Sequence, residues 1–147
     1  MFKKIIAALT VVASAYLTGC ASVPMESVEE DLARKEFNAP PEGKAGLYLY
    51  RDSMLGAALK KTVYIDGEMI GETAPKTYFY QDIAPGEHQL STESEFSDNL
   101  MKLMTESGKN YYVRQYIRMG AFIGGANLEL MSEKEGQQGV LECKLAK

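Results

Sequence analysis

The chain has 147 residues, two cysteines, and 16 basic against 20 acidic side chains, which gives a formal net charge of −4 at pH 7. This length suffices for one domain with a buried core. The acidic balance argues against a nucleic-acid partner, because such binding depends on basic surface that neutralises phosphates. Two cysteines near opposite ends of the chain exclude a framework of several disulfides.

The first residues have the pattern of a secretory signal peptide that ends in a lipid attachment site. Met1–Lys4 carries two positive charges and no acid, and an uncharged, mainly apolar run of twelve residues follows from Ile5 to Tyr16. A transmembrane helix needs about twenty residues, so this run indicates a signal peptide over 1–19. The next motif, Leu-Thr-Gly-Cys at 17–20, resembles the lipobox of bacterial lipoproteins. The resemblance implies a diacylglycerol on the Cys20 sulfur, cleavage before Cys20 and acylation of the new amine.

Removal of 19 residues from 147 leaves a mature chain of 128, and removal of the two leader lysines leaves 14 basic and 20 acidic residues, a balance of −6. Anionic headgroups repel such a surface, so the acyl chains on Cys20 must hold the protein at the membrane. Each buried methylene contributes about 0.8 kcal/mol to membrane binding. One acyl chain therefore gives only marginal attachment, whereas two or three acyl chains hold the protein durably. Ala21 follows the cysteine, and in sorting of the enterobacterial type a residue other than aspartate there implies the outer membrane. We therefore expect a lipid-anchored protein on the periplasmic face of the outer membrane.

Residues 20–43 are expected to form a lipidated tether between the anchor and the domain. Ser27 and Glu30 have the spacing of a capping box, which predicts a short helix with an apolar stripe of Val28, Leu32 and Phe37. A Pro-Pro pair follows and ends any helix, because proline removes a backbone donor and restricts the residue before it.

From residue 44 onwards the sequence alternates between apolar and polar residues and predicts short strands. The predicted strands are 47–50, 62–65, 69–73, 77–80, 87–92, 100–104, 111–118 and 127–131. Asp66-Gly67 lies between the second and third, as in type I′ hairpins, whose two central residues need positive φ. Many short strands with turn signals about every eight to twelve residues predict an antiparallel β-sandwich over 44–147.

A short C-terminal helix is predicted after the last strand. Ser132 and Glu135 have the spacing of a second capping box. Gly136 and Gly139 would weaken this helix by about 1 kcal/mol each relative to alanine. Val140, Leu141 and Cys143 are expected to face the sandwich.

Three segments resemble the PEGA-type surface domain. They are Val63–Gly67, Ile70–Thr73 and Ile83–His88. From about residue 41 to the C-terminus, the chain is similar to a family of small proteobacterial lipoproteins known only as a domain of unknown function. That family shares the Tyr-Arg strand end at 50–51 and the Gly-Lys-x-Tyr-Tyr-x-Arg strand at 108–114. The resemblance implies a PEGA-like or immunoglobulin-like β-sandwich and carries no catalytic or binding residue.

The residues offer little for catalysis or metal binding. The chain has one histidine, His88, and a Ser-His-Asp site would need both a carboxylate to orient its ring and a hydroxyl beside it. One histidine and one spare cysteine, far apart in the sequence, do not make a zinc site. The turn at Asp66–Glu68 lacks the other ligands of a calcium loop. We expect no enzyme activity, no metal and no cofactor.

Cys143 has no partner within the chain once Cys20 carries lipid. The usual role of such a residue is that of a small buried apolar side chain. A thiol that pairs with another chain is the alternative, since a leftover cysteine in a secreted protein can do so.

The strand predicted at 111–118 places tyrosine and arginine alternately on one face: Tyr112, Arg114, Tyr116 and Arg118. Such a face can stack on sugars or bind an acidic partner. The plainer interpretation is cross-strand pairing on a solvated sheet face, with the long stems lying flat.

Two connections between strands are unusually apolar, at 54–59 and at 119–126. Leu55 in the first, with Phe122 and Ile123 in the second, are the candidate contact residues. Loops are ordinarily polar, so these two either fold inward to close the end of the sandwich or present a binding surface. The binding interpretation gains if the two loops meet in space.

These patterns favour a non-catalytic, lipid-anchored module that binds a protein of the cell envelope. The alternative is a binding protein for a lipid or another apolar ligand, held in the mouth of the sandwich beneath the two loops. A deep apolar pocket would favour the ligand, and a flat exposed patch would favour the protein partner. A third hypothesis is an enzyme that uses His88.

Overall fold

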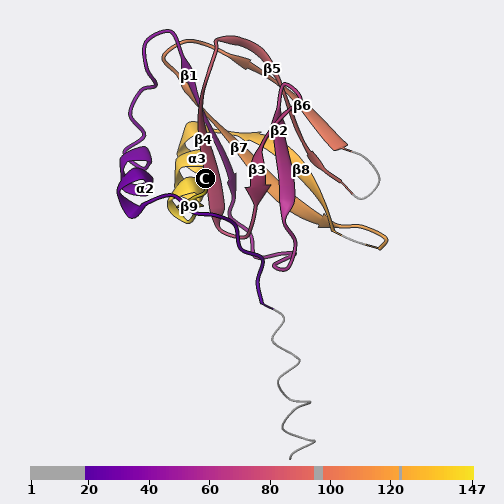
Figure 1. Cartoon of the computed structure of the whole chain (residues 1–147). Coiled ribbons are helices and arrows are strands. Elements are labelled where there is room, and N and C mark those ends of the chain that lie inside the picture. Colours follow the sequence, from indigo (N-terminus) through magenta and orange to yellow (C-terminus); the bar gives the residue numbers. More distant parts are fainter. Residues whose placement is uncertain (1–18, 95–97, 123) are drawn as a thin grey trace, which may run out of the picture.

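The computed structural model in Figure 1 describes residues 19–94, 98–122 and 124–147. The predicted signal peptide up to residue 18, and Ile123, lie outside the described residues. The described chain forms two β-sheets and two short helices. The predicted fold, mainly β with a short C-terminal helix, is therefore confirmed.

The larger sheet has five strands in the order β8-β7-β1-β4-β9, and the smaller has four in the order β3-β2-β5-β6. The strands are β1 Ala45–Arg51, β2 Lys61–Ile65, β3 Glu68–Thr73, β4 Thr77–Ile83, β5 Gly86–Glu93, β6 Asp98–Thr105, β7 Asn110–Met119, β8 Gly124–Met131 and β9 Lys144–Leu145. Helix α2 spans Val28–Arg34 and helix α3 spans Glu133–Leu141. Each predicted strand is present, and β9 is an addition.

The smaller sheet is antiparallel throughout, whereas the larger sheet is mixed. Strand β1 pairs in parallel with β7, with Tyr48 opposite Tyr112, and β4 pairs in parallel with β9. Parallel neighbours need a long crossover, and here strands β2 to β6 lie between β1 and β7 in the sequence. Alternation and turn motifs are local, so they carried no sign of these parallel pairs.

The core between the two sheets is aliphatic and contains one buried amide. Its apolar members are Ala45, Leu47, Leu49, Val63, Ile65, Ile83, Leu90, Leu103 and Val113. The side chain of Gln115 on β7 is also fully buried, and its nitrogen donates to Thr92 Oγ1 at 2.7 Å. Its oxygen accepts from the Thr73 hydroxyl. Because both threonines belong to the smaller sheet, these bonds tie the two sheets together and satisfy a buried polar group.

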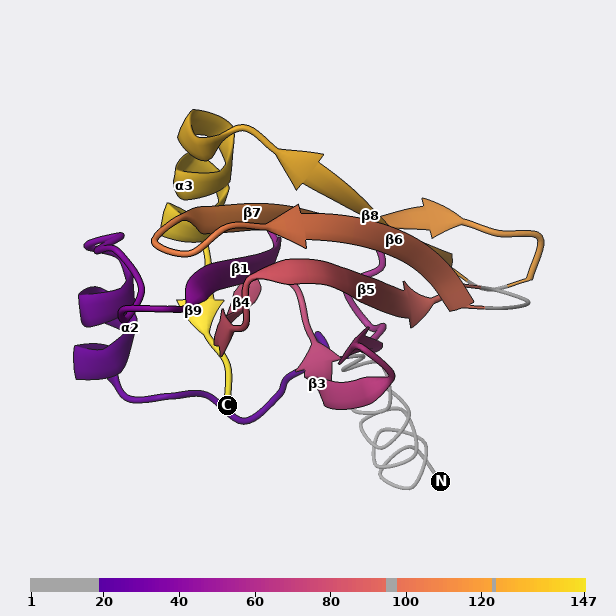
Figure 2. The ribbon, with the colours of Figure 1, turned by 90° about the horizontal axis from the view of Figure 1, so that it is seen from above.

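A second core covers the other face of the larger sheet, on the side where Figure 2 shows α2 and α3. Tyr48, Tyr50, Tyr78 and Tyr112 are almost completely buried there, and the rings of Tyr48 and Tyr112 stack with centroids 5.1 Å apart. Burial is the main cause that raises the pKa of Tyr48 and Tyr50 to about 12. The larger sheet is therefore covered on both faces, which explains the almost continuous burial of β1.

Two glycines let helix α3 lie directly on this tyrosine core. A Cβ on Gly136 would lie 2.1 Å from the Cβ of Tyr112, and a Cβ on Gly139 would lie 2.2 Å from Cε2 of Tyr50. No side chain fits into either space. The glycines that lower helix propensity are therefore the residues that allow the helix to approach the sheet closely.

We expect Gly136→Ala to lower the free energy of unfolding by about 2 kcal/mol, although alanine is the better helix former by about 1 kcal/mol. The new methyl group would overlap the Cβ of Tyr112, which is fixed to the strand backbone and cannot swing away. Urea unfolding measures the change. Gly139→Ala is the matched control and should cost less, because it meets the movable far end of the Tyr50 ring. Unchanged stability of Gly136→Ala would contradict the close contact.

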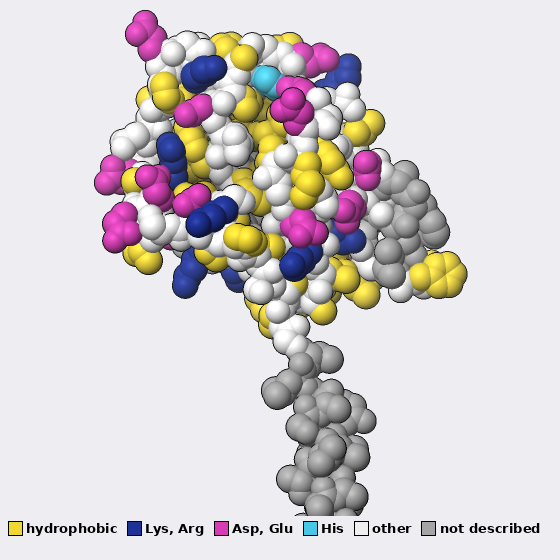
Figure 3. Space-filling view, in the orientation of Figure 1, with side chains coloured by type: hydrophobic (Ala, Val, Ile, Leu, Met, Phe, Trp, Pro, Cys, Tyr) yellow, Lys and Arg dark blue, Asp and Glu magenta, His cyan; other side chains and the backbone are white. Residues whose placement is uncertain are grey.

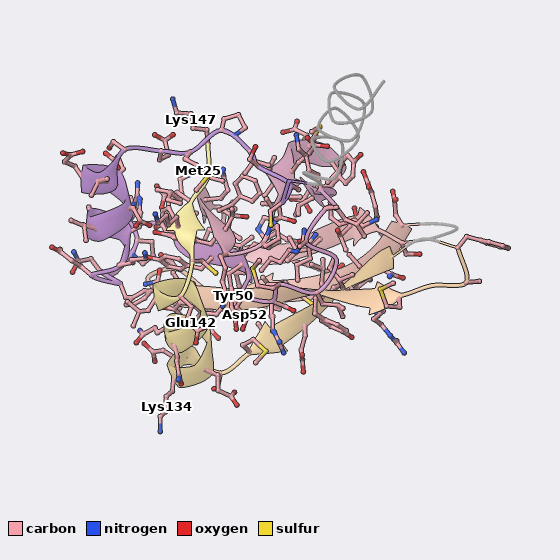
Figure 4. The ribbon with its side chains drawn as sticks, turned by 90° about the horizontal axis from the view of Figure 1, so that it is seen from below. Met25, Tyr50, Asp52, Lys134, Glu142 and Lys147 are labelled. Carbon is pink, nitrogen blue, oxygen red and sulfur yellow. The ribbon has the colours of Figure 1, made fainter. Side chains whose placement is uncertain are left out.

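The segment before α2 lies along the domain and extends the larger sheet. Met25 forms an antiparallel bridge with Ala146, and the backbone N–H of Lys147 donates to the Pro24 carbonyl at 3.0 Å. Figure 4 shows Met25 and Lys147 on the same side of the molecule. The predicted tether is therefore docked on the domain in this region instead of forming a free spacer.

Helix α2 begins as predicted but docks through polar groups. The Ser27 hydroxyl accepts the backbone N–H of Glu30 at 3.2 Å, which caps the helix. On the docked side, the carboxylate of Asp31 accepts the backbone N–H of Leu145 at 3.0 Å. Of the apolar residues expected on the helix, Val28 and Leu32 are exposed to solvent. Phe37 lies beyond the end of the helix and packs against the tyrosine core.

Candidate functional site

The predicted lipid attachment site lies beside the first apolar loop. Cys20 is exposed, and the backbone N–H of the next residue, Ala21, donates to the Ala57 carbonyl in the β1–β2 loop at 2.8 Å. In Figure 1 the chain leaves the domain toward residue 19 at the end that carries the β1–β2 and β7–β8 loops. We call this region the anchor end, and it comprises residues 20–21, 52–60 and 119–122.

Arg51 organises the β1–β2 loop from within. Its side chain is completely buried at the end of β1, and its guanidinium donates to the carbonyls of Leu59 at 2.7 Å and Gly56 at 2.8 Å. A third bond reaches the Leu55 carbonyl at 3.3 Å. Burial lowers the pKa of this guanidinium. Because the loop carbonyls turn inward to the charge, the side chains of Met54 and Leu55 are left half exposed.

The two apolar loops meet through Leu59 and Ile117. Leu59 Cδ1 lies 2.6 Å from the position that a Cβ on Gly124 would take, and Ile117 Cγ2 lies 3.0 Å from the corresponding position on Gly56. The inner parts of the loops therefore close the end of the sandwich. Their outer parts are exposed to solvent: Met119 is 70% exposed and Phe122 is 86% exposed. Figure 3 shows hydrophobic side chains at this end of the molecule.

The predicted tyrosine–arginine face of β7 is largely covered. Tyr112 is buried in the tyrosine core, so its predicted role as a surface contact is wrong. Arg114 is partly buried, and its Nε donates to the Asp52 carboxylate at 3.0 Å. Tyr116 is also partly buried, and Arg118 is exposed. Sequence alternation placed the four side chains on one face correctly, but helix α3 covers the first part of it.

His88 joins two turns of the smaller sheet. Its Nδ1 lies 2.6 Å from an oxygen of Asp66, and its Nε2 lies 2.6 Å from the Ala84 carbonyl. The other oxygen of Asp66 accepts the backbone N–H of Gln89 at 2.8 Å. A Ser-His-Asp site requires a hydroxyl beside one ring nitrogen of the histidine. In His88, a carboxylate lies at one ring nitrogen and a backbone carbonyl at the other. The geometry suits a protonated imidazole that donates two hydrogen bonds.

This arrangement makes the stability depend on pH in a defined direction. Burial alone lowers the pKa of His88, but its bonds to Ala84 and Asp66 outweigh burial and raise the pKa above its ordinary value. The stabilisation that His88 contributes is therefore complete at pH values below the pKa of histidine in the unfolded chain, about 6.5. It is lost as pH rises through the pKa of His88 in the folded protein. Bonds from Gln89 and His88 lower the pKa of Asp66, so its contribution is lost only as pH falls through its folded pKa.

We expect the free energy of unfolding to decrease as pH rises above about 6.5, and His88→Gln to abolish most of that decrease. Since His88 is the single histidine of the chain, the variant removes the one histidine titration in this range. Urea unfolding at several pH values measures both slopes. An equal slope in the two proteins would contradict the raised pKa.

Cys143 lies in the tyrosine core and is only 1% exposed. Burial is the main cause that raises the pKa of its thiol to about 12, and the sulfur donates weakly to the Arg51 carbonyl at 3.5 Å. The buried apolar interpretation is confirmed. Val140 is buried in the same core, whereas Leu141, which was also expected to face the sandwich, is exposed to solvent. A disulfide to another chain would require this part of the domain to open.

The hollow beside the β7–β8 loop is polar and open to solvent. It has a volume of about 270 Å³, and its lining includes Ser94, Asn99, Arg118 and Asn127. The ligand hypothesis requires a concave apolar pocket beneath the loops, but Leu59 and Ile117 pack into the space where the loops meet.

Among the described residues, no group of three His, Cys, Asp or Glu side chains lies close enough together to bind a metal ion. No helix in the described ranges has the length and apolar content to cross a membrane.

A family model described as a protein of unknown function, DUF2846, matches residues 41–126. The chain belongs to this family. An uncharacterized protein of Haemophilus influenzae is 50% identical over 145 residues, which cover 98% of this chain and 86% of that relative. No solved structure matches significantly. The predicted membership of a family of unknown function is confirmed, and the DUF2846 match contains Arg51 and both apolar loops while α3 and β9 lie beyond it.

Proposed function

We propose that this DUF2846 protein is a lipid-anchored lipoprotein of the cell envelope, a non-catalytic module that binds an envelope protein at the periplasmic face of the outer membrane. The position of Cys20 carries the proposal. The lipobox-like motif ends in an exposed cysteine, and the residues after it are hydrogen-bonded to the domain at Ala57, Leu145 and Ala146. Acyl chains on Cys20 would therefore hold the folded domain itself close to the bilayer.

The outer face of the smaller sheet supports the binding role. Met69, Tyr64, Ser91 and Leu100 lie opposite one another in successive strand pairs, so they form one row on a single face. Met69 is 59% exposed and Leu100 is 65% exposed, and Met104 is exposed on the same face of β6. Exposed apolar side chains on this face, bordered by the Lys102–Glu87 ion pair, suit a protein partner, because a small ligand needs a concave pocket.

The edge of this sheet adds backbone groups to the same surface. Strand β6 is the last strand of the smaller sheet, so its outer N–H and C=O groups are not paired within that sheet. An extended segment of a partner can pair with such an edge while its side chains contact Leu100 and Met104.

A photo-crosslinking amino acid at position 100, introduced into the full-length chain in cells, tests the binding role. We expect one discrete protein adduct, identified by mass spectrometry. The matched control is Lys134, which is exposed on α3 and points away from the sheets in Figure 4. No adduct at position 100, or the same adducts at both positions, would contradict a specific partner on this face.

A further inference from the structure

We propose that the anchor end lies on the lipid surface, with Met54, Leu55 and Phe122 in the interfacial layer of the membrane that holds the Cys20 lipid. The inference rests on the proposed lipidation of Cys20, and it specifies which surface of the domain the lipid brings to the bilayer. The occupant of this surface is a bilayer with anionic headgroups.

The anchor fixes the distance between the first loop and the membrane. A lipidated Cys20 must lie at the depth of the headgroups, because its acyl chains enter the hydrocarbon. Consecutive Cα atoms are about 3.8 Å apart, and Ala21 is bonded to Ala57 in the middle of the loop. The loop is therefore within one or two residues of the headgroups, and the β7–β8 loop, whose sequence includes Phe122, lies at the same end of the domain (Figure 1).

Four carbonyls of the β1–β2 loop have hydrogen-bond partners within the protein, which lowers the cost of placing the loop against an apolar layer. A backbone carbonyl without a partner is costly in lipid. In this loop, Arg51 bonds the carbonyls of Leu55, Gly56 and Leu59 from inside, and the N–H of Leu55 donates to the Ser53 hydroxyl at 3.0 Å. The Ala57 carbonyl accepts the backbone N–H of Ala21. These carbonyls are therefore turned to partners inside the protein, while the side chains of Met54 and Leu55 at the tip are half exposed.

The charge of the anchor end differs from that of the protein as a whole. The chain is acidic as a whole, yet the sequence has no Asp or Glu from 53 to 65 or from 107 to 128, and Asp52 at the start of the first loop is paired with Arg114. Lys60 and Arg118 flank the two loops and are exposed. Apolar tips bordered by cations match the interface of a bilayer that carries anionic headgroups. The net negative charge then lies on the surfaces that face away from the membrane.

The chain contains no tryptophan, so a single introduced tryptophan reports on one site. We would prepare Leu55→Trp and Phe122→Trp in the full-length chain, with Leu100→Trp as the matched control on the outer sheet face. Each protein is purified with its own lipid and reconstituted in vesicles of phosphatidylethanolamine and phosphatidylglycerol that contain brominated lipid. We expect bromine to quench most of the fluorescence of the two loop variants and little of the control.

Two measurements separate this inference from the proposed function. The mass of the purified protein tells whether Cys20 is acylated, and an unmodified cysteine would overturn the proposed function together with the inference. An acylated, vesicle-bound protein whose loop tryptophans stay unquenched would overturn the inference alone, as would equal quenching of the Leu100→Trp control. Circular dichroism checks that each variant is folded, and Met54→Trp replaces Leu55→Trp if that variant is not.

Discussion

Replacing Cys20 with serine should abolish incorporation of palmitate, leave the leader uncut and remove the protein from the outer-membrane fraction. A serine hydroxyl does not replace the thiol that accepts the diacylglycerol, and lipobox cleavage follows that modification. Each buried methylene contributes about 0.8 kcal/mol, so the loss of two or three acyl chains far exceeds what the few apolar side chains of the anchor end contribute. Metabolic labelling with palmitate, the mass of the N-terminal peptide and membrane fractionation measure the three effects.

The second cysteine provides the matched control for this experiment. Cys143 is buried in the tyrosine core, so Cys143→Ala removes a thiol without touching the anchor. We expect that variant to keep the label and the location, at a small cost in stability. Palmitate label on Cys20→Ser, or its loss from Cys143→Ala, would contradict the assignment of Cys20 as the lipid acceptor.

The strands and turns were predictable because their signals are local. Runs of β-forming residues bounded by turn motifs mark the strands, and Asp66-Gly67 forms the expected turn with both residues at positive φ, 52° and 83°. Strand β9 was missed for the opposite reason. It has two residues, Lys144–Leu145, and it exists because β4 lies on one side and residues 24–26 on the other. Neither neighbour is close to it in the sequence.

The candidate site was predicted in part, because alternation tells which side chains share a face but not what covers that face. Tyr112 was placed on the correct face of β7, yet a helix from the C-terminal region buries it. Gly136 and Gly139 are three residues apart and therefore lie on one side of a helix, which indicates that this side has no protruding side chains. The sequence did not indicate which part of the domain packs against that side. The two apolar loops were recognised correctly as unusual, and their meeting point depends on Leu59 and Ile117, which are distant in sequence.

Arg51 was missed as a site residue because an arginine at a strand end usually points to solvent. The resemblance to the family included this Tyr-Arg strand end, but nothing in the pattern indicated that the side chain turns inward. Its alternation with Leu47 and Leu49, which face the core between the sheets, was the available sign. The buried position of Arg51 makes it the residue on which the shape of the first loop depends.

Arg51→Ala should therefore lower the free energy of unfolding by about 3 kcal/mol, because a buried acceptor that loses its partner costs about 1–3 kcal/mol and three loop carbonyls lose theirs. Removal of the buried charge, whose Nε has no hydrogen-bond partner among the described residues, offsets part of that loss. Arg51→Lys should recover little, since one ammonium group does not reproduce the guanidinium fork.

The matched control is Arg114→Ala, which removes a partly exposed ion pair with Asp52 and should cost less than about 1 kcal/mol. Urea unfolding gives the two stabilities, and hydrogen exchange of residues 52–60 tells whether the loss is local to the loop. Arg51 holds the loop in shape if exchange in residues 52–60 becomes faster than the loss of global stability explains. Exchange in β5 and β6 should then increase only by the amount that the loss of global stability requires. Equal losses for the two arginines, or unchanged exchange in the loop, would contradict that role. Because the proposed membrane contact uses Met54 and Leu55 of the same loop, Arg51→Ala should also weaken the quenching of a tryptophan at position 55 in lipidated protein that is still folded.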